Sequence, residues 1–193
     1  MTMACSDTEY LDRFESILEE GLLRLSSNLG LTDGVMLSSD DIVSKWNDSL
    51  MQEYVADAVE NFNAYPEVAI AWAAYLGVGV AHDWDAGFDL FSVRRYRDYY
   101  GPRGFDDMDE HIVAVTGADE AWMVKLRLSL QSLAVAALGL MRHEGVEAET
   151  ERGFYVLVRI YSVMFRLGAS TELRRLGYRN VRAGLPGQRC RQS

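Results

Sequence analysis

Apolar side chains recur at steps of three and four residues along most of this chain, which is the period of an amphipathic α-helix. One such series runs from Leu11 to Leu29 and ends at Gly30. Another places an apolar side chain at every fourth position from Ile42 to Phe62. Only three prolines interrupt the 193 residues. The pattern therefore predicts an all-α protein and not a turn-rich β fold.

Two helices, predicted at 66–84 and 119–142, are the most apolar parts of the chain. Each contains an uncharged run of 14 residues. Spanning a bilayer takes about 20 apolar residues, so runs of this length indicate buried core helices and no membrane segment. Gly77 and Gly79 lower the helix propensity of the first helix, which is tolerable where a neighbouring helix approaches closely. We expect both helices to lie largely buried at the centre of a bundle.

The remaining chain adds further helices around these two. They are predicted at 88–100, 107–115 and 147–167. The helical pattern weakens at Gly168, with two further turns expected before Gly177. A chain of this length buries roughly 70% of its extended surface around one core. We therefore expect a single all-α domain of six or seven helices over residues 1–183, followed by a flexible basic tail at 184–193.

The charges are divided unevenly along the chain. Residues 1–151 carry a net charge of −18, whereas residues 152–193 carry +8, with nine arginines against the single acid Glu172. The net charge of −10 argues against a general affinity for nucleic acid. Only the arginine-rich C-terminal segment remains as a candidate surface for phosphates.

Arg152, Arg159 and Arg166 follow one another at intervals of seven, so they line one face of a helix. This stripe suits the acidic surface of the same chain, around 40–57 or 106–110. It also suits an acidic partner protein or a second copy of the chain. Binding of a nucleic acid through the C-terminal arginines is the third interpretation.

The sequence His82–Asp83–Trp84–Asp85 is the strongest local candidate for chemistry. It stands at the predicted end of the most buried helix, where an imidazole and two carboxylates beside an aromatic ring would suit a small-molecule pocket. The alternative is structural: Asp83 and Asp85 solvate the helix end, and His82 bonds to a neighbouring carbonyl. No motif indicates a metal site or a bound cofactor, so we expect neither.

The remaining features favour a protein without catalysis. No nucleophile arrangement or phosphate loop is present, and Cys5 and Cys190 lie outside any metal-ligand spacing. Two cysteines without a secretory signal indicate a reducing compartment, so we expect a cytoplasmic protein. The leading interpretation is a non-enzymatic helical module for protein interaction or self-association. A small-molecule-binding protein or enzyme using His82, Asp83 and Asp85 is the alternative.

Overall fold

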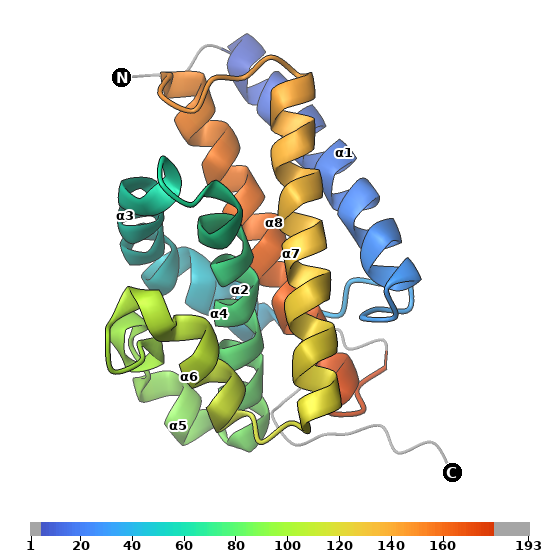
Figure 1. Ribbon diagram of the computed structural model, residues 1–193, viewed down its shortest axis with the longest axis vertical. Helices are drawn as coiled ribbons and strands as arrows, with labels where there is room; N and C mark the ends of the chain where they lie inside the picture. The colour runs from blue at the N-terminus through green and yellow to red at the C-terminus, as the bar shows by residue number, and fades with distance from the viewer. Residues whose placement is uncertain (1–4, 180–193) are drawn as a thin grey trace.

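The computed structural model describes residues 5–179 and confirms the predicted all-α bundle (Figure 1). The helical elements are α1 (Cys5–Asn28), α2 (Asp40–Lys45), a π-helical turn (Trp46–Leu50), α3 (Met51–Phe62), α4 (Pro66–Ala86), α5 (Phe88–Val93), two 3-10 turns (Tyr96–Tyr99 and Phe105–Asp107), α6 (Met108–Val115), α7 (Glu120–His143) and α8 (Glu151–Arg175). No strand occurs within 5–179. The basic tail predicted at 184–193 lies outside the described residues.

α4 and α8 form the centre of the bundle and pack more extensively against each other than any other pair of helices in 5–179. Every residue of α4 from Ala69 to Ala81 is buried, which confirms the prediction for this helix. The second central helix was predicted wrongly. α8, and not the helix at 119–142, makes the more extensive contact with α4, and residues 167–173 of α8 are all buried.

Glycines bring the backbones of α4 and α8 into contact. A Cβ atom added at Gly77 would lie 2.0 Å from the carbonyl oxygen of Phe165. One added at Gly168 would lie 1.8 Å from the carbonyl oxygen of Ala74. The close approach predicted at Gly77 is therefore confirmed. Gly168, however, does not weaken or end its helix: α8 continues to Arg175, because the missing side chain is what lets α4 pass.

α7 lies at the edge of the bundle, packed on α4, α1 and α8 along one side only. Figure 1 shows it at the front of the molecule, between α1 and α4. Among the described helices, α7 alone is long and apolar enough to cross a membrane by length and composition, and 39% of its most apolar stretch is buried in the bundle. The prediction that 119–142 is largely buried was thus wrong, because its apolar residues surround the helix and only one side meets the core.

The segment from α2 to α3 is one unbroken helical stretch with a π turn in its middle. Its apolar residues repeat every four positions, whereas an α-helix turns every 3.6 residues, so the stripe would rotate by about 40° at each step. A π turn takes up an extra residue and rotates the stripe back. All six members are buried as a result: Ile42, Trp46, Leu50, Tyr54, Ala58 and Phe62.

The helix predicted at 88–100 is shorter than expected. α5 ends at Val93, and Arg94 is extended before the 3-10 turn at Tyr96–Tyr99. The backbone N–H of Arg95 donates to the Asp98 carboxylate at 2.7 Å, which holds the tighter turn. The break allows Tyr96 and Tyr99 to enter the core together.

Candidate functional site

The end of α4 places His82 against a fully buried carboxylate on α8. Nδ1 of His82 lies 3.2 Å from Oε1 of Glu172. Arg175 donates to both oxygens of the same carboxylate, at 2.7 Å to Oε2 and 2.5 Å to Oε1. The hydrogen bond with Glu172 raises the pKa of His82, and burial opposes this effect. Glu172 is thus a buried anion between two cations that joins the ends of α4 and α8.

Asp83 points in another direction, toward the chain that follows α5. Its Oδ2 lies 3.3 Å from Nε of Arg94, in an ion pair of which the carboxylate is buried and the arginine is partly exposed. Tyr99 lies beside it, and burial together with the charge of Asp83 raises the pKa of the Tyr99 hydroxyl. Asp83 therefore positions the segment that replaces the second half of the predicted helix at 88–100.

Asp85 and the neighbouring Trp84 bind two further elements. The hydroxyl of Tyr178 donates to Oδ1 of Asp85 at 2.9 Å. Nε1 of Trp84 donates to Oδ2 of Asp41 at the start of α2, at 3.0 Å. Each predicted residue of this segment is turned toward a different partner, so the three do not converge on one space. The geometry supports a structural role for the three residues, but not in the form expected. Asp83 is buried and paired instead of solvating the helix end, Asp85 accepts from Tyr178, and the partner of His82 is a carboxylate and not a carbonyl.

The arginine stripe of α8 meets an acidic face of α1. Arg152 lies 3.0 Å from Asp7, and Arg159 lies 3.0 Å from Asp12. Arg152 also stacks over the Tyr10 ring, with its Cζ 5.2 Å from the ring centroid. The opposite charges therefore pair within the chain.

Glu15 of α1 joins the other two arginines of the stripe. Its two carboxylate oxygens accept from Arg159 at 2.5 Å and from Arg166 at 2.7 Å, and Arg166 also pairs with Glu19 at 2.8 Å. The expected partner segments, 40–57 and 106–110, were wrong. The N-terminal helix supplies the acids, because α1 is the helix that packs along this side of α8.

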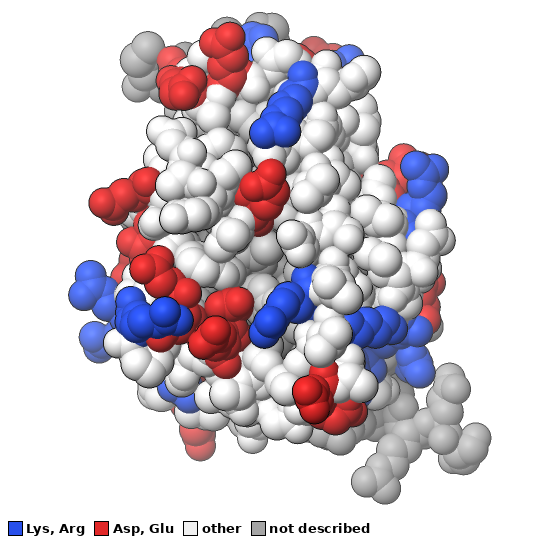
Figure 2. Space-filling view, viewed as in Figure 1, with Lys and Arg blue, Asp and Glu red and all other residues white. Residues whose placement is uncertain are grey.

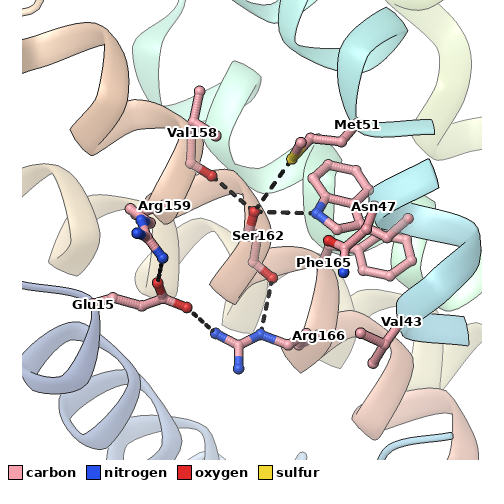
Figure 3. A pocket seen from close by; sticks show the side chains of 10 residues that line it. Glu15, Val43, Asn47, Met51, Val158, Arg159, Ser162, Phe165 and Arg166 are labelled. Carbon is pink, nitrogen blue, oxygen red and sulfur yellow. Dashed lines mark hydrogen bonds and ion pairs between the residues drawn. The ribbon is translucent and has the colours of Figure 1, made fainter. Parts of the chain in front are cut away.

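A cavity of about 480 Å3 opens beside the π turn, and sequence reasoning did not find it. Apolar side chains form one part of its lining: Val43, Trp46, Met51, Val158 and Phe165. Figure 3 shows Glu15 between Arg159 and Arg166 at one edge, with Ser162 in the middle. The size and the mixed lining are typical of small-molecule pockets.

Hydrogen bonds and ion pairs within the chain occupy the Ser162 hydroxyl and both arginines of this cavity, whereas Asn47 also lines it and is exposed. The Ser162 hydroxyl accepts from Nε1 of Trp46 at 3.1 Å and lies 2.9 Å from the carbonyl oxygen of Val158, to which it donates. Arg159 and Arg166 each pair with two carboxylates of α1. The cavity therefore offers an apolar surface more than a charged one. Two of the predicted binding arginines line it, and Arg152 does not.

The outer side of α7 carries the largest apolar side chains that this helix leaves in solvent. Val124, Leu128 and Val135 are 54%, 60% and 52% exposed. Ala136 and Gly139 are also exposed on this side, and no charged residue occurs between 128 and 141. Figure 2 shows the front face of the molecule, where the area over the middle of α7 is mostly uncharged. We call the row from Val124 to Gly139 the α7 strip.

The charged residues that flank the α7 strip interact with other parts of the same chain. Nζ of Lys125 donates to the carbonyl oxygen of Gly30 at 2.9 Å. The charge of Arg127 acts on the Tyr75 hydroxyl and opposes the rise in its pKa that burial causes. The strip between them carries no charged residue, and Gln131 and Ser132 are the exposed polar residues at its middle.

Two sequence signals could have located these features. The four-residue repeat from Ile42 to Phe62 is too long a period for an α-helix, and so indicates the π turn next to the cavity. The run at 128–141 has apolar residues on all sides of its helix, more than one core contact can cover.

No cluster of three or more metal-ligating side chains is found in residues 5–179. Comparison of the chain with protein-family models, with curated proteins and with solved structures found no match.

Proposed function

We propose that this protein is a non-enzymatic helical interaction module that associates with a second copy of itself through the α7 strip. The carrying observation is the exposure of Val124, Leu128 and Val135 in one uncharged row. Large apolar side chains that are exposed together on one uncharged face mark interaction sites in soluble proteins. Charge is a weaker candidate for association, since the arginine stripe is paired with α1.

The ends of the strip favour an antiparallel arrangement of two α7 helices. Glu120 lies exposed at one end, and Arg142 and His143 lie exposed at the other. None of the three forms an ion pair with another described side chain. Antiparallel pairing brings Glu120 of each protomer close to Arg142 and His143 of the other. The dipoles of the two helices then point in opposite directions, which is also favourable.

The same register fits the side chains in size. With the twofold axis between positions 131 and 132, Val124 lies opposite Gly139, and Leu128 lies opposite Val135. In each pair the larger side chain thus faces a smaller one, which lets the two helices pack closely. The strip is about 24 Å long, from its residue count and the helical rise of about 1.5 Å per residue. One helix pair buries less than a standard interface, so the dissociation constant should lie in the micromolar range.

The test compares two chemically identical substitutions. Val135→Asp places a carboxylate in the strip, and Val93→Asp places one on α5, where Val93 is 70% exposed. Sedimentation equilibrium should give twice the 21.7 kDa chain mass for the wild type and for Val93→Asp. Val135→Asp should be monomeric. A monomeric wild type, or an equal loss in both variants, would reject the proposal.

A second function, small-molecule binding, is favoured by the cavity beside the π turn. Its occupant would be a largely apolar molecule, because Glu15, Ser162 and the two arginines of the lining are paired within the chain and the Asn47 amide is the polar group left for a ligand. Native mass spectrometry of the purified protein should then show a retained mass that the filling variant Val158→Phe loses. The absence of any added mass in the wild type would leave the α7 strip as the only supported function.

A further inference from the structure

A second pocket lies where the C-terminal ends of α1 and α8 approach the N-terminal end of α7 (Figure 1). Its volume is about 180 Å3. Four cationic side chains line it: Lys125, Arg174, Arg175 and Arg179. This concentration of positive charge is unexpected in a chain with a net charge of −10. We call it the basic pocket.

Two of these cations form ion pairs with the same exposed acid. Asp33 is ion-paired with Arg174 and also with Arg179, whose Nη1 lies 3.0 Å from Oδ2. Arg175 is paired with the buried Glu172. Two carboxylates thus form ion pairs with three of the four cations. The hydrogen bond with Glu172 raises the pKa of Arg175, and the charges of Asp119 and Asp85 also act on Arg175 and raise its pKa.

Lys125 is the cation without an acid. It forms no ion pair with any carboxylate in residues 5–179, and its Nζ instead donates to the carbonyl oxygen of Gly30 at 2.9 Å. Nη1 of Arg174 reaches the same oxygen at 3.2 Å. Gly30 follows the end of α1, where the helix dipole favours cations but supplies only a partial negative charge. The ammonium group keeps two further N–H donors for a ligand.

Trp122 closes one side of the basic pocket. Cζ of Arg175 lies 5.1 Å from the centroid of its ring, so the guanidinium is stacked between the aromatic face and Glu172. This contact holds Arg175 in place before any ligand arrives, which lowers the ordering cost of binding.

We infer that the basic pocket binds the phosphate group of a small molecule. A phosphate group carries about 1.5 to 2 negative charges at neutral pH, which Lys125 and the three arginines that line the basic pocket can balance. Its oxygens suit an ammonium and several guanidinium groups as donors. The volume admits one such group, whereas a nucleic acid would require a series of phosphate contacts along the surface.

Isothermal titration of inorganic phosphate and of pyrophosphate into the full chain, in a chloride buffer, tests the inference. The wild type should show saturable one-site binding. Lys125→Gln should weaken the affinity about tenfold, as expected for the loss of a charge-assisted hydrogen bond. Asp33→Asn should strengthen it, because Arg174 and Arg179 are released to the ligand. The control Arg152→Gln removes a paired cation at the other end of α8 and should leave the affinity unchanged.

Several outcomes would overturn the inference. One is the absence of saturable phosphate binding in the wild type. Another is an equal loss in Lys125→Gln and Arg152→Gln, which would show an effect of net charge alone. Binding of a single-stranded oligonucleotide without binding of pyrophosphate would assign the surface to nucleic acid instead. If Lys125 serves only to cap α1, Lys125→Gln will lower the melting temperature and leave phosphate affinity as in the wild type.

Discussion

Replacing Gly168 by alanine tests the contact between α4 and α8. In an unobstructed helix this substitution stabilises a protein by about 0.5–1 kcal/mol. Here the new Cβ would lie 1.8 Å, 2.6 Å and 2.8 Å from O, C and Cα of Ala74. Ordinary Cβ contacts start at 3.4 Å, so the backbones have to separate by more than 1 Å.

The cost follows from what blocks the methyl group. Overpacking a core costs about 1–3 kcal/mol, and the upper end applies because a backbone cannot rotate away as a side chain can. Subtracting the helix-propensity gain leaves a net destabilisation of about 2 kcal/mol. With a urea m-value of about 2 kcal/mol/M, the midpoint of unfolding should fall by about 1 M.

Gly21→Ala is the matched control, since nothing lies within 4 Å of a Cβ added at Gly21 in α1. Its urea midpoint should rise slightly, by the propensity gain alone. Unfolding is followed by tryptophan fluorescence and by circular dichroism, which should give coincident curves. A Gly168→Ala protein as stable as the Gly21→Ala protein would refute the close crossing of α4 and α8.

Three further results are expected at the charged sites. Glu172→Gln should lower the free energy of unfolding by about 2 kcal/mol in urea titrations, because it leaves two cations beside a neutral amide; an unchanged midpoint would contradict the buried network. The wild type should have a higher free energy of unfolding than His82→Gln. This difference should be full below the ordinary histidine pKa of about 6.5 and decline as the pH rises through the raised pKa of His82 in the folded protein. A difference that stays constant between about pH 6 and about pH 9 would argue against the Glu172 contact. The full chain and a chain without residues 180–193 should behave alike in a filter-binding assay with RNA. A salt-sensitive RNA complex that the full chain forms and the shortened chain does not would support the nucleic-acid interpretation.

The periodicity of the sequence correctly predicted the fold class and most of the helix positions. It failed at α8 because Ser170, Thr171 and Glu172 look like exposed residues in the sequence. In the fold they are buried with partners: Ser170 accepts from the N–H of Leu37, Thr171 donates to the carbonyl of Leu167, and Glu172 binds Arg175. Periodicity does not show which polar residues will find such partners.

The functional surfaces were harder to predict for a related reason. The motif at His82, Asp83 and Asp85 placed polar groups close in sequence, but the fold directs them to three different partners. The basic pocket brings together Lys125 of α7 and Arg179, which follows the end of α8, and no local pattern shows that these distant residues meet. The spacing of Arg152, Arg159 and Arg166 correctly predicted that they share one face of a helix. It did not predict that the acids of α1 would pair with them.

The most direct test of the proposed dimer is disulfide cross-linking at the twofold axis. In a chain with Cys5 and Cys190 replaced by serine, Gln131→Cys places one thiol in the middle of the α7 strip. Gln52→Cys places it on the exposed side of α3 as a control. Mild oxidation should convert the Gln131→Cys protein into a covalent dimer and leave the Gln52→Cys protein monomeric. A Gln131→Cys protein that stays monomeric, or that cross-links no faster than the control, would contradict association through α7.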